Sequence, residues 1–178
     1  MLLILSLFSC LALRAQSPSV DPRGLFVLVG GEETDDASTG QNAPLEAHFT
    51  ANPSDLGDYT ARYEWKIWEA DDPATVLVHR FEENMDYTFT RSGTFMVQLY
   101  ATFVFETDTI SVPELGDENP IVVSISESKL EMSNAFSPNG DGFNDVYRVK
   151  SGYQSIVDFK ATIFNRWGQK IYSWTDLE

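Results

Sequence analysis

The chain has 178 residues, with 12 Lys and Arg against 27 Asp and Glu, so its formal net charge is −15. An apolar content of 43% excludes a wholly disordered chain. The acidity argues against nucleic acid and anionic bilayer surfaces as partners, because both would repel the protein. The single Cys excludes an internal disulfide and a Cys-rich zinc site. Cations, basic surfaces and uncharged partners stay open.

Residues 1–15 predict a secretory signal peptide. The apolar run from Leu2 to Leu13 is too short to span the hydrocarbon core of about 30 Å, and Ala15 followed by a polar residue is the expected cleavage site. Two alternatives stay open, which are lipoprotein processing at Cys10 and a buried N-terminal element. No segment after this one is expected to cross a membrane, so the sequence predicts an exported protein.

Residues 16–127 predict a series of short strands. Alternation with a period of two residues is frequent, and no stretch of ten or more residues has helical spacing. Tyr63, Trp65 and Ile67 share one face of a predicted strand. Other predicted strands lie at 76–78, 87–89, 94–105 and 120–126, with turn signals at 52–54, 71–73, 91–93 and 113–119. This pattern predicts an all-β, antiparallel sandwich.

Two acidic clusters, residues 32–36 and 114–118, lie in segments with Gly or Pro that predict loops. Solvated loop charge is the simpler interpretation. Loop carboxylates can also gather a calcium ion, which would offset part of their mutual repulsion. The sequence does not place the two clusters close together.

Segments 44–49, 63–65 and 87–99 together resemble the PKD-type immunoglobulin-like module. The resemblance covers roughly residues 22–127 and implies an immunoglobulin-like sandwich with Trp65 in its core. Trp68 would lie on the opposite face of the same strand. Packing on the surface and stacking against a carbohydrate are the two interpretations of Trp68 that stay open.

Residues 133–145 read SNAFSPNGDGFND, which is typical of a tight polar loop. Pro138 presets its φ, and Gly140 and Gly142 permit left-handed backbone geometry. The short side chains of the loop offer oxygen atoms to backbone N–H groups or to a cation.

Asn139, Asp141 and Asp145 are the candidate ligands for calcium in this loop. Their spacing matches positions 3, 5 and 9 of an EF-hand loop, but Arg148 stands where that loop needs a bidentate Glu. Two interpretations therefore stay open. One is calcium bound in a shortened loop, and the other is a structural loop in which Asx side chains cap backbone N–H groups.

Residues 159–174 read FKATIFNRWGQKIYSW and predict a β-hairpin. Phe159, Ala161 and Ile163 alternate on one strand face, residues 165–168 make the turn, and residues 170–172 begin the second strand.

The segments AFSPNGDGFNDVY and TIFNRWGQKIY together closely resemble the gliding motility-associated C-terminal domain, the type B sorting domain of the type IX secretion system. The resemblance implies a β-sandwich-type sorting domain, the type IX machinery as a partner, and export across both membranes to the cell surface or beyond. The motif residues that it assigns are Phe136, Pro138, Asn139, Gly140, Asp141, Gly142, Asn144, Asp145, Phe164, Asn165, Arg166, Trp167 and Gly168. Family members continue into further strands, so we expect the domain in this chain to be incomplete at its C-terminal end.

The sequence predicts no enzyme. His48 and His79 are the only histidines and lie in unrelated predicted strands, and the chain has no G-x-S-x-G, H-E-x-x-H, Walker or dinucleotide-binding motif.

The expected organisation is a signal peptide at 1–15, a PKD-like sandwich at 16–127 and a truncated sorting domain at 128–178. We expect an exported protein whose sandwich is a structural or adhesion-type interaction module for an extracellular protein. A glycan-binding accessory module is the alternative. No catalytic residue and no cofactor are assigned, apart from the open question of calcium.

Overall fold

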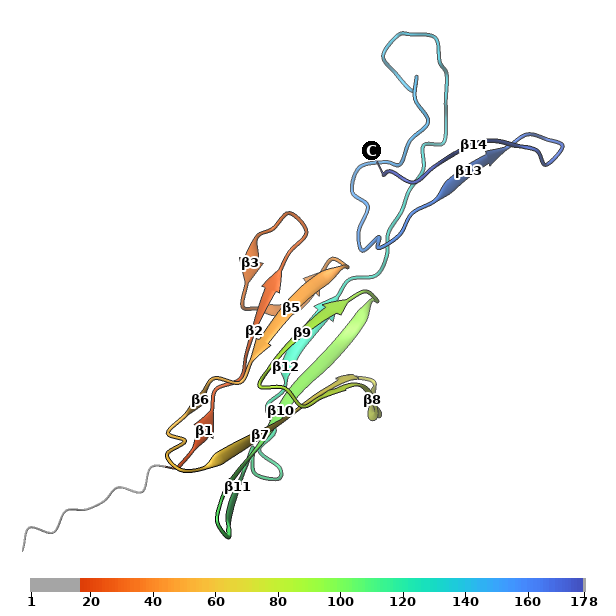
Figure 1. Cartoon of the computed structure of the whole chain (residues 1–178). Coiled ribbons are helices and arrows are strands. Elements are labelled where there is room, and N and C mark those ends of the chain that lie inside the picture. Colours follow the sequence, from red (N-terminus) through yellow and green to blue (C-terminus); the bar gives the residue numbers. More distant parts are fainter. Residues whose placement is uncertain (1–16, 178) are drawn as a thin grey trace, which may run out of the picture.

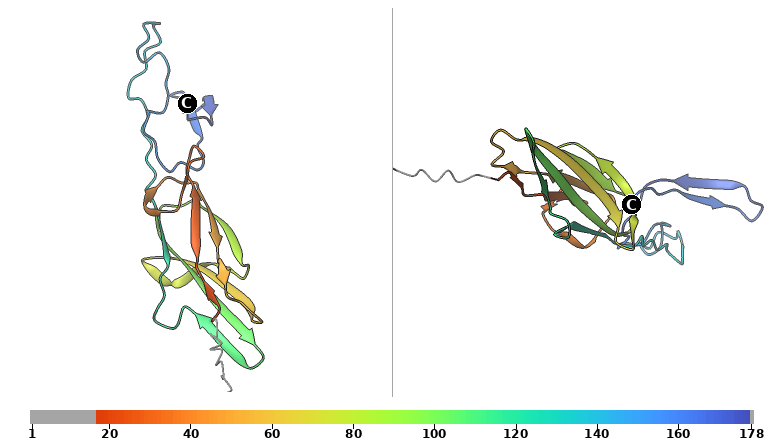
Figure 2. Two further views of the ribbon diagram at one scale, coloured as in Figure 1. Left: turned by 90° about the vertical axis from the view of Figure 1, so that its left-hand side faces the viewer. Right: turned by 90° about the horizontal axis from the view of Figure 1, so that it is seen from below.

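A computed structural model of the chain describes residues 17–177, and this range is all-β (Figures 1 and 2). The expected signal peptide, with Ala15 and Cys10, lies outside the described residues. Within residues 17–177, no helix is long and apolar enough to cross a membrane. The chain forms a two-layered sandwich, and an extended C-terminal part leaves the sandwich after its last strand.

Two sheets make up the sandwich. The four-stranded sheet has the order β3 (Glu33–Thr34), β2 (Arg23–Val27), β5 (Leu45–Thr50), β9 (Asn84–Phe89). The other sheet has the order β4 (Ala37–Gln41), β12 (Ile121–Ile125), β10 (Gly93–Phe105), β7 (Thr60–Glu69), β8 (Asp72–Arg80), and β11 (Asp108–Val112) pairs with the far half of β10. A small ladder joins β1 (Ser19–Val20) to β6 (Pro53–Ser54). This architecture confirms the predicted all-β, immunoglobulin-like sandwich.

One strand pair corrects the prediction of a purely antiparallel sandwich. Strand β4 runs parallel to β12, with Ala37 opposite Val123 and Gln41 opposite Ile125. The chain leaves the four-stranded sheet after β3 and joins the edge of the other sheet as β4. The residues of β4, ASTGQ, have no apolar alternation, so no local pattern predicts this strand.

Three predicted turns also contain strand residues, one of which is Gly93, the first residue of β10. Strand β8 begins at Asp72 and includes Pro73, a residue that sheets tolerate on edge strands such as β8. Pro53 and Ser54 form the short β6. Within the acidic cluster at 32–36, Glu33 and Thr34 form β3 and are not purely a loop.

Trp65 lies at the centre of the sandwich core, as predicted. It is 0% exposed, its indole N–H donates to the Glu83 carbonyl at 3.2 Å, and its ring centroid lies 5.8 Å from that of Phe49. Both sheets contribute fully buried side chains to this core, among them Phe26, Leu45, Phe49, Phe89, Ile67, Val97, Leu99 and Val123. The sandwich therefore has a continuous core of its own.

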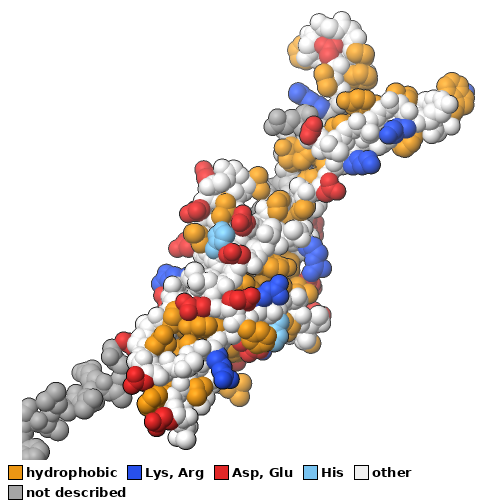
Figure 3. Space-filling model, viewed as in Figure 1, with side chains coloured by type: hydrophobic (Ala, Val, Ile, Leu, Met, Phe, Trp, Pro, Cys, Tyr) orange, Lys and Arg blue, Asp and Glu red, His pale blue; other side chains and the backbone are white. Residues whose placement is uncertain are grey.

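The C-terminal part has little buried surface. Between residues 128 and 177 the only named strands are β13 (Ala161–Phe164) and β14 (Lys170–Trp174), which form a hairpin. Among the described residues from 128 onward, only Val149 and Ser155 are buried. The two parts of the chain also differ in net charge. Residues 17–127 have 5 basic residues (Lys and Arg) against 21 acidic residues (Asp and Glu), whereas residues 128–178 have 6 basic and 6 acidic residues. Acidic side chains accordingly stud the sandwich in Figure 3.

Candidate functional site

The loop between residues 133 and 145 is closed by backbone contacts. The N–H of Ser137 donates to the carbonyl of Asn144 at 2.9 Å. Three residues in the loop have left-handed backbone conformations, which are Gly140 (φ +77°), Gly142 (φ +86°) and Asn144 (φ +55°). Gly adopts this region without a steric penalty, and Asn tolerates it better than most residues. The two glycines of the motif are therefore required by the path of the backbone.

The carboxylate of Asp145 lies against this turn. Oδ1 accepts the N–H of Gly140 at 2.7 Å, and Oδ2 accepts the N–H of Gly142 at 2.8 Å. These hydrogen bonds stabilise the ionised carboxylate and lower the pKa of Asp145 below its usual value. One side chain thus caps two glycine N–H groups, which explains an Asp at this position.

Asp141 and Asn139 brace the tip of the loop. Asp141 accepts the N–H of Phe143 through Oδ1 at 2.8 Å and the side-chain amide of Asn139 through Oδ2 at 2.8 Å. The backbone bond from Phe143, followed by the bond from Asn139, lowers the pKa of Asp141. Asn139 in turn accepts the N–H of Asp141 through Oδ1 at 3.3 Å.

The three candidate calcium ligands therefore lie in one loop, but their oxygen atoms already accept hydrogen bonds. A cation would compete with these N–H groups for the oxygen atoms of Asn139, Asp141 and Asp145. Across residues 17–177, no three His, Cys, Asp or Glu side chains are grouped so that they could hold a metal ion. The capping bonds are those that the Asx-turn interpretation predicts, and calcium binding stays a prediction.

The hairpin places the second motif segment at a tight turn. Ile163 lies opposite Tyr172, and the register shifts before Phe164 and Lys170. Asn165 closes the turn, since its Oδ1 accepts the N–H of Trp167 at 2.9 Å and that of Gln169 at 3.0 Å. Its side chain and the backbone contacts between residues 165 and 169 fix the turn geometry. Asn165 is therefore a structural residue of the motif.

Other motif residues of the hairpin face the solvent. Trp167 is 74% exposed and Phe164 is 59% exposed. The guanidinium of Arg166 lies over the Trp167 ring, 5.1 Å from its centroid. From residue 159 to residue 174 the hairpin has three basic residues and no acidic residue. Figure 3 shows basic and apolar side chains along the hairpin, in contrast to the acidic sandwich.

An aromatic cluster joins the loop to the hairpin. Tyr147 makes edge contacts with Phe136 at 6.3 Å and with Trp174 at 6.4 Å between ring centroids. Trp174 also contacts Phe159 at 6.2 Å and stacks on Tyr172 at 5.9 Å. These rings bring the two motif segments into one unit. No local pattern in the sequence marks Tyr147 and Trp174 as the residues that link the segments.

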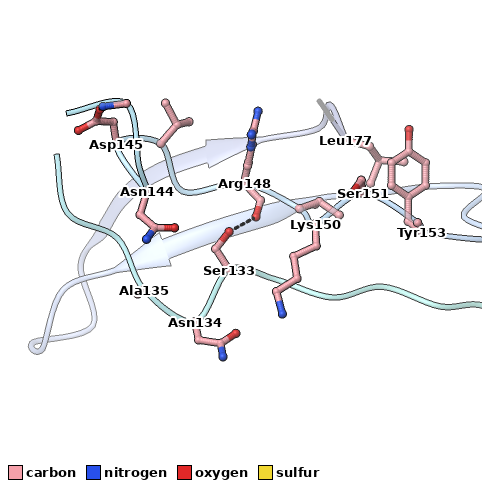
Figure 4. A pocket seen from close by; sticks show the side chains of 14 residues that line it. Ser133, Asn134, Ala135, Asn144, Asp145, Arg148, Lys150, Ser151, Tyr153 and Leu177 are labelled. Carbon is pink, nitrogen blue, oxygen red and sulfur yellow. Dashed lines mark hydrogen bonds between the residues drawn. The ribbon is translucent and has the colours of Figure 1, made fainter. Parts of the chain in front are cut away.

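An apolar groove runs between loop and hairpin, lined by Phe136, Val146, Tyr147, Ile163, Tyr172 and Trp174, with Asp145 at its edge. A second, more polar depression lies beside it (Figure 4). Arg148 and Lys150 both line that depression, but Figure 4 shows their side chains pointing to opposite sides. Lys150 lies 3.4 Å from the carboxylate of Glu131. The two basic groups therefore do not converge on one anion.

The candidate residues of the sandwich lie apart from one another. His48 on β5 pairs with Asp86 at 2.7 Å, and His79 on β8 pairs with Glu64 at 2.6 Å, so the two histidines belong to different sheets. Trp68 is half-buried on the outer face of β7. In the described part of the chain its ring contacts no other aromatic ring.

Comparison with known proteins gives one match. Residues 130–178 match the family model described as the CHU_C Type IX secretion signal domain. No curated protein and no solved structure matches the chain. The matched range contains both the capped loop and the hairpin, and it confirms the resemblance found in these two segments.

Proposed function

Residues 130–178 are a type IX secretion signal domain, which implies export to the cell surface or the extracellular space, and from this premise we propose a function for the whole chain. The chain is a non-enzymatic surface or secreted protein. Its C-terminal domain is the address read by the type IX machinery, and its sandwich is a structural or adhesion-type module that contacts an extracellular protein.

The motif residues fall into a structural group and an exposed group, and this separation supports the proposal. The side-chain oxygen atoms of Asp145 and Asn165 accept hydrogen bonds from backbone N–H groups, so these two residues fix the local fold of the domain. The side chains of Phe164, Arg166 and Trp167 point outward on the hairpin and, among the described residues, none of them makes a hydrogen bond to the backbone. Exposed aromatic side chains beside an Arg are typical of protein recognition sites. We therefore assign recognition by the machinery to the hairpin and shape to the loop.

The structural role of the sandwich is supported by its core and by its histidines. Its continuous core gives the module a rigid frame on which sheet faces and edges are available to a partner. His48 and His79 each contact a different carboxylate on separate sheets, an arrangement that does not resemble a shared catalytic site. A glycan-binding surface would call for a pair of exposed, coplanar aromatic rings on one sheet face. The lone Trp68 lends that alternative no support, and the protein-contact role is preferred.

The match to the secretion signal domain carries the proposal, and a localisation experiment tests it. The full chain with an epitope tag inserted in the exposed 114–118 loop would be produced in a bacterium that has the type IX system and in an isogenic strain in which that system is inactivated. We expect the tag to be accessible to antibody on intact cells of the first strain only. Equal surface exposure in both strains would contradict the proposal.

A further inference from the structure

One buried serine fastens the C-terminal part to the sandwich. Ser155 Oγ accepts a hydrogen bond from the backbone N–H of Ala43 at 3.1 Å, across a sequence separation of 112 residues. Ser155 is only 6% exposed, and Ala43 is 3% exposed. Ala43 belongs to the sandwich core cluster and lies on the connection from β4 to β5. A polar side chain of the sorting domain is therefore inserted into the end of the sandwich.

The surroundings hold Ser155 in an unusual conformation. Its φ is +48°, in the left-handed region that serine seldom adopts. Such a conformation persists where neighbouring contacts offset its cost. Here the carbonyl of Ser155 accepts the hydroxyl of Ser128 at 2.9 Å, and the adjacent Gln154 exchanges two backbone hydrogen bonds of 3.0 Å with Lys129. The segment is thus clamped to the chain that connects the two parts.

The connection itself leaves almost no free chain. Strand β12 ends at Ile125, and the next residue, Ser126, donates its N–H to the carbonyl of Gln41 at 2.8 Å. Hydrogen bonds resume at Ser128 and Lys129. Because a flexible linker needs several unrestrained residues, this connection cannot let the two parts reorient freely. Figure 1 shows the C-terminal part leaving the sandwich directly after β12.

From these contacts we infer that Ser155 docks the sorting domain onto the sandwich, so that the two move as one rigid unit. Ser155 is a positioning residue, which fixes the direction in which the hairpin with Trp167 is presented. The biological meaning of this docking rests on the proposed function. If the secretion machinery recognises the C-terminal domain, docking makes the segment around Ala43, between β4 and β5, part of the rigid unit that the machinery binds. The docking contact itself is a property of the isolated protein.

The docking is tested by NMR on the purified full chain. Nitrogen-15 relaxation should give one rotational correlation time for the strands of the sandwich and for β13 and β14, and the amide of Ala43 should be protected from exchange. Ser155→Ala removes the hydroxyl, and Ser155→Gly removes it while relieving the left-handed backbone. In both variants we expect exchange at Ala43 to accelerate about tenfold, because a buried donor loses its acceptor. The matched control is Ser151→Ala, which alters an exposed serine of the same segment. It should change neither the rotational correlation time nor the exchange rate of the Ala43 amide.

Each outcome decides the inference. Separate correlation times in the unaltered protein would overturn it, as would unchanged protection of Ala43 in both Ser155 variants. Loss of protection in Ser155→Ala but not in Ser155→Gly would also overturn the role given to the hydroxyl. The NMR result does not depend on secretion, so a docked protein whose surface exposure is independent of the type IX system would refute the proposed function alone. If both hold, Ser155→Ala should reduce the surface-exposed fraction in cells while Ser151→Ala does not.

Discussion

Replacing Trp65 with Phe tests the sandwich core most sharply. Trp65 is fully buried, contacts Phe49, and donates its indole N–H to the carbonyl of Glu83. Phe lacks two of the carbons and the nitrogen of the Trp side chain, and the two carbons cost roughly 1–2 kcal/mol at about 0.8 kcal/mol for each buried carbon group. The loss of a partner for the Glu83 carbonyl adds about 1 kcal/mol. We therefore expect Trp65→Phe to lower the free energy of unfolding by about 2–3 kcal/mol.

Urea unfolding followed by far-UV circular dichroism measures this change. A slope of about 1–3 kcal/mol per molar urea converts the expected loss into a midpoint roughly 1–2 M lower. Trp68→Phe is the matched control, since Trp68 lies three residues along the same strand but is only half-buried on the outer face. Its midpoint should fall by less than half as much. Equal effects of the two substitutions would refute the assignment of Trp65 to the core.

The remaining predictions concern the surface of the sandwich and the two motif segments. The hydrogen bond to Asp86 raises the pKa of His48, so this pair stabilises the fold below about pH 6.5 and loses its effect as pH rises through the folded-state pKa. His48→Gln should therefore lower the urea midpoint near pH 5.5 but not near pH 8.5. An equal drop at both pH values would contradict a stabilising pair between His48 and Asp86. Asn165→Ala should broaden or shift the NMR amide signals of Trp167 and Gln169 while leaving β7 unchanged, and unaltered signals would exclude the turn described here. Asp145→Asn should disturb the amides of the capped loop in the absence of any metal. If the loop is purely structural, millimolar calcium leaves the melting temperature of the full chain unchanged, whereas a rise that Asp145→Asn abolishes would establish the calcium interpretation.

Local pattern was enough to predict the sandwich where apolar alternation was strong. The alternation of Tyr63, Trp65 and Ile67 predicts one buried strand face, and the described structure buries Trp65 and Ile67. The tight polar loop could likewise be predicted, because its Asx side chains bond to the N–H groups of glycines only a few residues away. These features depend on neighbours in the sequence.

Contacts between distant segments could not be predicted in the same way. Ser155 and Ala43 are separated by 112 residues, and neither has a neighbourhood that marks it as buried. The parallel pairing of β4 with β12 also brings together segments far apart in the chain, and β4 has a polar composition. Tyr147 and Trp174 meet only once the hairpin folds against the loop. Sequence patterns predict such contacts poorly, because contacts between distant segments depend on the topology of the fold and not on local periodicity.

The proposed function requires that the secretion machinery recognises the exposed side chains of the hairpin during export. The most direct test is the surface-exposed fraction of the full chain on intact cells with an active type IX system, comparing the unaltered protein with Trp167→Ala. Phe81→Ala is the matched control, an aromatic residue of the sandwich that is 68% exposed, close to the 74% of Trp167. We expect Trp167→Ala to lower the surface-exposed fraction severalfold and Phe81→Ala to leave it unchanged. Full surface exposure of Trp167→Ala would contradict the recognition role of the hairpin.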